Sequence, residues 1–290
     1  MRRFDLIHTH DIRFLLEASL LAHVWFGKPL IVGSHGFIFH QRRLHWLKAA
    51  AFQLYYRPLL AHASGLHVVS PQDRARIQGL HGRVEVREIG GGIAYQEFAT
   101  VRRMPQPGRL LYFGRLDSNK GIEQIFQLLP HLPGTELHLV FGSYNAEYKR
   151  SLEELQNQLE IRHRIHWHGN LPHSGLLDQL AKCLCVILPS RYEGFGLTTL
   201  EAMAAAVPVV CNRIDAFQNI ITDGTNGILI DFSDSARAVE QLRRFLTKSS
   251  RELASIATEG QRTARQCDWD LRVAELERWY DELVPMPHLG

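Results

Sequence analysis

Two carboxylates, Glu193 and Glu201, enclose a short segment that contains the glycines Gly194 and Gly196. Glu193 stands just before the two glycines, where no helix cap or helical ion pair needs a carboxylate, so we interpret it as a site residue. Glu201 follows Thr198 by three residues, which is the spacing of a capping box, so a structural role stays open for it. The segment between the two carboxylates is therefore the first candidate site.

The elements around this segment are predicted to be a strand, a loop, a helix and a second strand. The apolar run 183–188 is too short for a typical helix and is stopped by Pro189, which predicts a buried parallel strand. Residues 197–206 are rich in Leu, Ala and Met and favour a helix, which Pro208 ends before the apolar run 207–211. In an open α/β sheet, the loop after such a strand lies where ligands bind, and the free N–H groups of the next helix can hold an anion.

A second loop of the same kind carries two cations, Arg115 and Lys120. It begins at Gly114 after the apolar run 110–113 and leads into a helix predicted from Ile122. Cations at the start of a helix oppose the helix dipole, so an anionic ligand would explain both of them. A diphosphate fits, because arginine, lysine and a helix N-terminus together could hold it. The alternative is a pair of solvated surface cations.

The sequence Glu193-Gly-Phe-Gly-Leu-Thr-Thr-Leu-Glu201, followed by Ala-Met-Ala and Pro-Val-Val, resembles the signature of the family-4 retaining glycosyltransferases. This family has the GT-B fold, in which two Rossmann-like domains face each other across a cleft. The resemblance implies that Arg115 and Lys120 hold the donor diphosphate, that Glu193 binds donor-sugar hydroxyls and that Glu201 binds the ribose. The donor-binding positions that it implies are Gly114, Arg115, Lys120, Leu171, Glu193, Gly194, Phe195, Gly196, Leu197, Thr198 and Glu201.

A histidine in the first half of the chain belongs to the same implied site. His35 follows the apolar run 31–33, so a parallel strand would deliver its side chain to the cleft. Alone, a histidine in such a loop is more often structural, but in the resembling family a histidine here lies beside the donor sugar and the acceptor. Leu171 lies in the loop 169–172, which in the family lines the pocket for the nucleotide base. The catalytic residues that the resemblance implies are His35, Glu193, Arg115 and Lys120.

Paired histidines and cysteines could suggest a metal, but their spacing argues against one. His8 and His10 alternate along a predicted strand, as do His166 and His168, which puts each pair on one face without supplying a third ligand. We therefore predict no metal site. The four cysteines have no pair at zinc-finger spacing and are expected to be reduced thiols in or near the core; they are Cys183, Cys185, Cys211 and Cys267.

Charge is distributed unevenly along the 290 residues, although the whole chain carries only +3. Residues 1–104 contain 14 Lys and Arg against 7 Asp and Glu, a net charge of +7, while residues 105–290 contain 19 against 23, a net charge of −4. The first part is therefore expected to face an anionic partner, such as a membrane surface or a lipid phosphate. The sequence has no helix-turn-helix, zinc or RNA-binding signature, so nucleic acid is not an expected partner.

A helix predicted over residues 39–60 bears on the location of the protein. Leu44, Leu47 and Leu54 fall at helical spacing, so the helix either packs by one apolar stripe or rests on an acidic lipid surface with the help of Trp46. Apolar runs are shorter than the roughly 18 residues of a membrane span, and the start of the sequence lacks the apolar core of a signal peptide. We expect a cytoplasmic protein, with peripheral attachment to the inner face of the plasma membrane as the alternative that this helix leaves open.

The predicted fold class is α/β, with the GT-B arrangement of two Rossmann-like, doubly wound parallel-sheet domains. Residues 1–104 are expected to form the acceptor-side domain and residues 105–268 the nucleotide-sugar domain, with Pro105 and Pro107 marking the boundary. Residues 269–290 are expected to form a helix that crosses back to the first domain, as in the resembling family. Family members normally begin with a strand that precedes this sequence, so the first domain is expected to be shortened.

The predicted activity is transfer of a hexose, with retention at the anomeric carbon, from a nucleotide diphosphate sugar to a lipid-linked or polysaccharide-precursor acceptor. The resemblance is strongest to bacterial exopolysaccharide mannosyltransferases, which favours mannose from GDP-mannose. The donor is a substrate, and no cofactor is expected. Two other hypotheses stay open. One is a non-catalytic nucleotide-sugar-binding subunit, and the other is a glycosidase that uses Glu193 and Glu201, although Arg115 and Lys120 would then have no diphosphate to hold.

Overall fold

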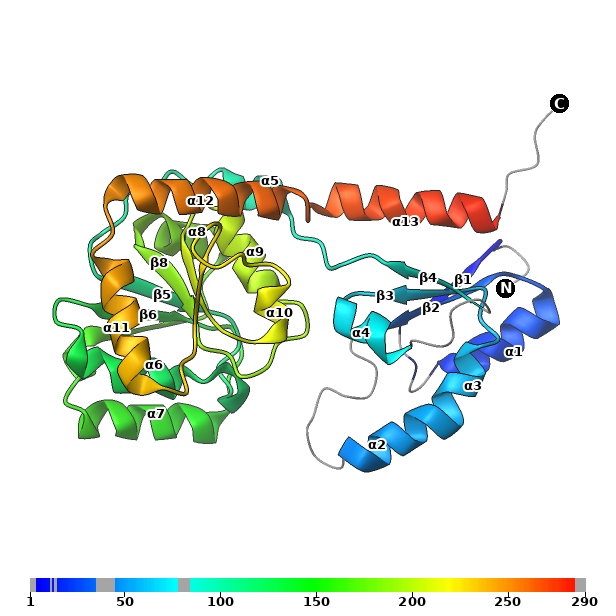
Figure 1. Ribbon diagram of the computed structural model, residues 1–290, viewed down its shortest axis with the longest axis horizontal. Coiled ribbons are helices and arrows are strands. Elements are labelled where there is room, and N and C mark those ends of the chain that lie inside the picture. Colours follow the sequence, from blue (N-terminus) through cyan, green and yellow to red (C-terminus); the bar gives the residue numbers. More distant parts are fainter. Residues whose placement is uncertain (1–3, 11, 13–14, 35–44, 78–83, 285–290) are drawn as a thin grey trace. The chain divides into compact units, whose positions relative to one another are not determined.

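The chain folds into two compact α/β units. The computed structural model describes residues 4–10, 12, 15–34, 45–77 and 84–284. One unit combines Met1–Gly92 with Trp269–Gly290, and the other is Ile93–Asp268. Each unit is built on a parallel sheet with helices on its faces (Figure 1), which confirms the predicted fold class of two parallel-sheet domains.

The first unit has a four-stranded parallel sheet in the order β1-β2-β3-β4 among its described residues. The strands β1 and β2 lie where the sequence predicts them, at His8 and at the apolar run 31–33. The elements of this unit are β1 (Ile7–Thr9), α1 (Leu16–Phe26), β2 (Leu30–Ser34), α2 (His45–Ala51), the π-helix η1 (Phe52–Tyr56), α3 (Arg57–Leu60), β3 (Gly65–Val68), α4 (Pro71–Arg76), β4 (Glu85–Glu88) and α13 (Trp269–Leu283).

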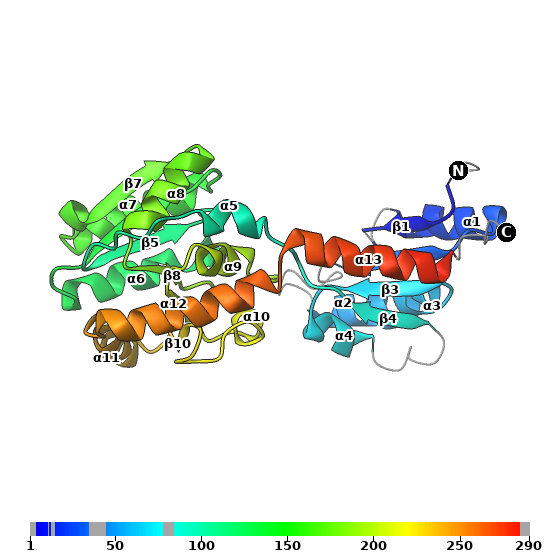
Figure 2. The ribbon, with the colours of Figure 1, turned by 90° about the horizontal axis from the view of Figure 1, so that it is seen from above.

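The C-terminal helix α13 covers one face of the first sheet, as Figures 1 and 2 show. Its Trp279 is fully buried with Ile31 and Ile89, and the indole Nε1 donates to Glu85 Oε2 at 3.2 Å. Gly65 makes room for it, because a Cβ at this position would lie 2.4 Å from the indole ring. The opposite face of the sheet packs on α1, η1 and α3 through a separate apolar cluster that includes Leu16, Phe52 and Leu60.

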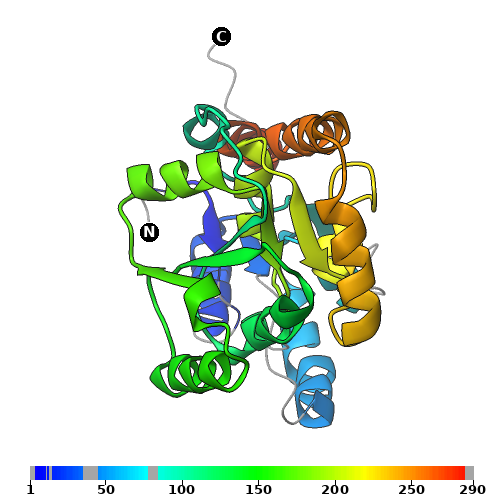
Figure 3. The same cartoon turned by 90° about the vertical axis from the view of Figure 1, so that its left-hand side faces the viewer.

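The second unit has a six-stranded parallel sheet in the order β10-β9-β8-β5-β6-β7. Helices cover both faces, with α6, α7 and α11 on one side and α5, α8, α9 and α12 on the other (Figures 1 and 3). The elements are α5 (Tyr95–Ala99), β5 (Arg109–Phe113), η2 (Ser118–Lys120), α6 (Ile122–Leu128), η3 (Leu129–His131), β6 (Glu136–Val140), α7 (Ala146–Gln158), η4 (Arg162–Arg164), β7 (Ile165–Gly169), α8 (His173–Lys182), β8 (Cys185–Leu188), α9 (Leu197–Ala204), β9 (Val209–Asn212), α10 (Asp215–Gln218), β10 (Ile228–Ile230), α11 (Ser235–Leu246) and α12 (Ser250–Arg265).

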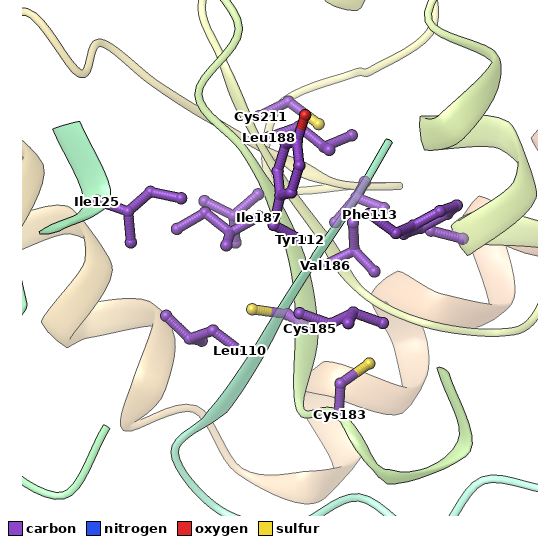
Figure 4. Close-up of a cluster of buried hydrophobic side chains, with 14 of the residues drawn as sticks. Leu110, Tyr112, Phe113, Ile125, Cys183, Cys185, Val186, Ile187, Leu188 and Cys211 are labelled. Atoms are coloured by element: carbon purple, nitrogen blue, oxygen red, sulfur yellow. The ribbon is translucent and has the colours of Figure 1, made fainter. Parts of the chain in front are cut away.

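Buried strands at the centre of this sheet explain its apolar runs. Leu110 and Leu111 of β5 pair with Cys185 and Val186 of β8, and all four side chains are fully buried (Figure 4). A parallel strand with helices on both faces has no solvent side, so its sequence is continuously apolar rather than alternating. The cysteines follow this pattern: Cys183, Cys185 and Cys211 are buried, Cys267 is partly buried, and all four are free thiols.

The link between the units differs from the boundary that the proline pattern suggests. The sequence predicts a boundary at residue 104, yet the compact second unit begins at Ile93. The Met104 N–H donates to Ala181 O at 2.8 Å, which holds the residues before Pro105 and Pro107 on the second unit. The prolines therefore lie in a segment that runs along the second unit.

The helix predicted over residues 39–60 is described from His45 onward, and residues 39–44 lie outside the described part of the chain. The helical stretch is continuous to Leu60 but changes to a π-helix over Phe52–Tyr56. Within the described residues, none of the helices combines the length and apolar character that crossing a bilayer requires.

Candidate functional site

Two loops of the second unit meet at the point where its strand order reverses. The chain adds β6 and β7 on one side of β5, and it then returns to add β8, β9 and β10 on the other. The loop after β5 carries Lys120, and the loop after β8 carries Glu193. Neighbouring parallel strands end at the same edge, and ligands of open α/β sheets bind at such a reversal. The topology therefore brings the two sequence-predicted loops together.

Lys120 and Glu193 form an ion pair at this place. Lys120 Nζ lies 2.7 Å from Glu193 Oε1, and only 12% and 15% of the two side chains are exposed. Ser190 Oγ also donates to Glu193 Oε1 at 2.7 Å. Both bonds go to the same carboxylate oxygen. A lysine and a glutamate that lie 73 positions apart thus hold each other in a site largely shielded from water.

Backbone and amide contacts fix the two loops against each other. Gln124 Nε2 donates to Gly121 O at 3.1 Å and to Pro189 O at 3.0 Å, so one side chain bridges both loops. The Arg191 N–H donates to Asn119 O at 2.8 Å. Reasoning from the sequence did not identify Gln124, because a single glutamine in the first turn of a helix carries no signature of such a role.

Arg115 lies at the open side of the same loop. Its side chain is 71% exposed, and its guanidinium lies 3.7 Å from Asp117 Oδ2. The Tyr112 hydroxyl donates to the Arg115 carbonyl, which holds the backbone of the loop while the side chain stays accessible. Burial, followed by the negative charge of Glu193, raises the pKa of Tyr112 well above its usual value, so this hydroxyl keeps its proton. The loop thus carries one exposed cation, Arg115, and one shielded cation, Lys120.

A pocket of about 460 Å³ opens beside Arg115 at the ends of β5, β6 and β7. Gly114, Arg115 and Leu171 line it, so the structure brings three of the sequence-predicted residues together. Asn170, which belongs to the loop 169–172, also lines it, and so does His173, which was not among the sequence-predicted residues. The pocket has the size and the position for a planar ring next to a cationic loop.

Gly196 shapes the start of α9, which follows the loop that carries Glu193. Its φ is +87°, in the left-handed region, and a Cβ there would meet the Phe217 ring at 3.2 Å. The helix begins at Leu197 with Gly196 as N-cap and has no side-chain cap. The capping box considered for Thr198 and Glu201 is therefore not formed. Burial raises the pKa of Glu201, so its charged form lacks full compensation before a ligand binds.

The structure places the remaining predicted residues as follows. Gly194, Phe195 and Thr198 lie in or directly after the same loop, with Gly194 exposed and Phe195 and Thr198 partly buried. His35 lies outside the described residues, so its place in the site stays a prediction.

Each histidine pair has a third possible metal ligand beside it, so that part of the sequence prediction is wrong. The two histidine pairs were expected to lack a third ligand, because a strand presents only alternate residues on one face. Neighbouring strands supply the third group in two places, which are His8 with His10 and His67 in the first unit, and His166 with Glu136 and His138 in the second. In each group, one possible ligand atom per residue lies within 4.8 Å of the others.

Two family models match the chain. Residues 97–263 match the family described as "Glycosyl transferases group 1", and residues 1–92 match the "Glycosyl transferase 4-like domain". The first match covers the whole of the sheet that carries Lys120 and Glu193.

Similar proteins are known by sequence and by structure. The chain is 24% identical over 300 residues to the GDP-mannose:cellobiosyl-diphosphopolyprenol alpha-mannosyltransferase of Xanthomonas oryzae, covering 100% of this chain and 77% of that protein. It is 27% identical over 303 residues to a glycogen synthase of Mycobacterium tuberculosis, covering 99% and 72%. The structure of Anabaena HepE in complex with UDP superposes with a TM-score of 0.82 at 19% identity, covering 97% of this chain and 79% of that one. The structural likeness shows a shared fold.

Proposed function

We propose a specific reaction for this chain, which belongs to the glycosyl transferases group 1 family and is a glycosyltransferase with the GT-B fold that uses a nucleotide sugar as donor. It transfers mannose from GDP-mannose, with retention at the anomeric carbon, to a lipid-linked or polysaccharide-precursor saccharide. The observation that carries the site assignment is the shielded pair of Lys120 and Glu193 at the strand-order reversal. A cation for the leaving diphosphate and a carboxylate for the sugar are the two charges that such a transfer needs side by side.

The donor would lie across the loop after β5. Its base would enter the pocket lined by Leu171 and Asn170, and its diphosphate would lie between Arg115, Lys120 and the first N–H groups of α9. Preorganised cations and backbone N–H groups stabilise the charge that grows on a departing diphosphate, and they can do so without a metal. Glu201 would bind the ribose, where hydroxyl donors would compensate its buried charge.

Glu193 would act on the sugar. The bond between the anomeric carbon and the diphosphate oxygen breaks, the acceptor oxygen takes its place on the same face, and the acceptor proton leaves with the nucleoside diphosphate. Glu193 Oε1 is occupied by Lys120 and Ser190, so Oε2 is the atom that we assign to donor-sugar hydroxyls and to the positive charge of the transition state. His35, by its place in the resembling family, would orient the sugar and the acceptor.

Mannose and the acceptor class rest on the relatives. The Xanthomonas relative, which aligns along this whole chain, is named for GDP-mannose as its donor and a diphosphopolyprenol saccharide as its acceptor. The relative at 27% identity is named a glycogen synthase, and the HepE structure of similar fold holds UDP, so neither of these two names points to GDP-mannose. A donor panel is therefore the direct test.

The experiment compares GDP-mannose, UDP-glucose and ADP-glucose as donors with a synthetic diphospholipid disaccharide as acceptor, and it assigns the product anomer by NMR. We expect mannosyl transfer from GDP-mannose with an α-linked product, and loss of transfer in Lys120→Met while the protein stays folded. Transfer from UDP-glucose or ADP-glucose alone would refute the mannose assignment. Full activity of Lys120→Met would refute the site.

A membrane surface is the proposed location of the acceptor. Trp25 at the end of α1 is 77% exposed, and Trp46 and Leu54 of the next helical stretch are 71% and 81% exposed. Tyr55 Oη donates to Glu17 Oε1 at 2.7 Å, which ties the two helical stretches together. Exposed aromatic and aliphatic side chains on the positively charged part of the chain suit an anionic lipid interface.

Vesicle flotation tests this surface. We expect the protein to bind vesicles that contain phosphatidylglycerol and not vesicles of phosphatidylcholine alone, and the double variant Trp46→Ser with Leu54→Ser should lose most of the binding. Equal binding by the variant and the wild type would refute the assignment.

A further inference from the structure

Four polar side chains gather on the face of β6 and β7 that lies under α8. Glu136 and His138 are two residues apart on β6, and His166 and His168 are two residues apart on β7. His138 and His166 are direct partners in the parallel ladder. Alternate residues of a strand share a face, and Trp167 packs against Phe126 of α6 on the other face, so the histidines point the opposite way. The proposed donor site uses none of these four side chains.

Three of the groups have the separations of metal ligands. Glu136 Oε2 lies 2.9 Å from His166 Nε2 and 3.7 Å from His138 Nε2. One ligand atom of each residue lies within 4.8 Å of the other two. Ligands at the usual Zn–N and Zn–O distances of a tetrahedral site are about 3.3 Å apart, so the two measured separations lie on either side of this value.

The buried member of the group needs a partner. The side chain of His138 is 6% exposed, and its Nε2 has no hydrogen-bond partner among the described residues. Its other ring nitrogen, Nδ1, is 2.9 Å from His168 Nε2. When His138 donates from Nδ1 to His168, its Nε2 carries a lone pair directed toward Glu136. A second histidine that holds the far nitrogen of a ligand is the arrangement that orients imidazoles in metal sites.

We propose that Glu136, His138 and His166 bind a Zn²⁺-class divalent ion, with His168 as the residue that orients His138. Two imidazoles and one carboxylate form a donor set that zinc accepts together with a water molecule in the fourth position. The side chains of Glu136 and His166 are 53% and 39% exposed, which leaves an entry path and lets both side chains turn toward an ion. The ion would cross-link the edge strand β7 to β6.

Burial and a neighbouring cation shape the affinity of this site. The imidazole of His138 is buried, which shields its Nε2 from competing water. Arg109 opposes a second positive charge, but its guanidinium donates outward to Gln106 and Gln179. Glu136, at the amino end of β6, supplies a negative charge that offsets the positive charge of Arg109. The site lies on strands, apart from the loops that would hold the donor.

Zinc titration by calorimetry tests the proposal in the full chain. The background variant His10→Asn removes the other histidine group, at His8 and His67, from the titration. In this background we expect one equivalent of Zn²⁺ to bind, and Mg²⁺ not to compete. Glu136→Gln and His166→Asn should each weaken Zn²⁺ binding at least tenfold. Both side chains are partly exposed, so these variants should fold, and thermal unfolding without metal checks that they do.

His163→Asn is the matched control, because His163 is an exposed histidine of η4 outside the cluster. It should leave Zn²⁺ binding unchanged. The proposal is overturned if the background variant binds no Zn²⁺, or if Glu136→Gln and His166→Asn bind it as tightly as the background does. The measurement is metal binding rather than sugar transfer, so its outcome does not depend on the proposed function.

Discussion

The ion pair of Lys120 and Glu193 leads to a prediction with an unusual sign. Without a donor, Lys120 is neutralised by the carboxylate that should later act on the sugar. A bare nucleoside diphosphate must therefore compete with Glu193 for the lysine, and it must also tolerate the negative charge of Glu193 nearby. We expect Glu193→Gln to strengthen nucleoside diphosphate binding while it removes sugar transfer.

The magnitude follows from the burial of the pair. Exposed ion pairs contribute about 0.2–1 kcal/mol, whereas removing one partner of a fully buried pair costs about 3–5 kcal/mol. This pair lies between these cases, because the side chains are 12% and 15% exposed and Ser190 continues to satisfy residue 193. Releasing Lys120 should thus be worth about 1–2 kcal/mol, which is about a 5- to 30-fold lower Kd. Transfer should fall about 100-fold or more.

Calorimetric titration with GDP measures the first effect, and the transfer assay measures the second. Lys120→Met should weaken GDP binding by about 10- to 150-fold, since hydrogen bonds to charged groups contribute about 1.5–3 kcal/mol. Glu240→Gln is the control, because Glu240 pairs with Arg244 on the exposed side of α11 and should not affect the Kd.

Two results would refute this reasoning. If Glu193→Gln weakens GDP binding, Glu193 positions Lys120 for the diphosphate rather than competing with the diphosphate for Lys120. If neither Glu193→Gln nor Lys120→Met changes the Kd, the diphosphate does not reach this pair.

Three further predictions concern stability and the shape of the site. Trp279→Ala should lower the free energy of unfolding of the first unit by about 3–5 kcal/mol in chemical denaturation, because the indole is fully buried, whereas the exposed Trp46→Ala should have little effect. Gly196→Ala should cost about 1–2 kcal/mol in the same assay and weaken GDP binding, because its φ is positive, while Gly194→Ala, with open space at its Cβ, should leave the free energy of unfolding unchanged. Burial raises the pKa of Glu201 above 4.5, so its ionised form destabilises the fold near pH 7, and this penalty fades as the pH falls through that pKa. Glu201→Gln should therefore raise the melting temperature at pH 7 more than at pH 4. The same variant should weaken GDP binding. Equal melting shifts at both pH values would contradict the burial argument.

The fold was largely predictable because strand signals in this sequence are strong. The runs 110–113 and 183–188 are continuously apolar, as strands buried on both faces must be, and their loops contain the glycines and prolines that end them. The pairing of β5 with β8 brings Lys120 and Glu193 to one edge, a grouping that the family resemblance implied and the strand pattern alone did not.

Contacts that depend on side-chain direction were not predictable. Lys120 and Glu193 lie in loops, where no periodicity shows which way a side chain points. Their residue types fit a bond between them as well as they fit two side chains that both point at a ligand. The third ligand beside each histidine pair was not predictable for a related reason. Alternation along one strand shows which residues share a face, but only the register between β6 and β7 shows that Glu136 lies beside His166.

The return of α13 to the first sheet has a consequence for biosynthesis. The first unit is discontinuous in sequence, because the whole of Ile93–Asp268 lies between its two segments. Until α13 leaves the ribosome, the groove over Gly65 that receives Trp279 stays open, with Ile31 and Ile89 uncovered. The second unit can complete its sheet earlier, since all its strands come from one continuous segment. The nascent chain would thus finish its second half first, and it would expose an apolar surface of its first half for most of its synthesis.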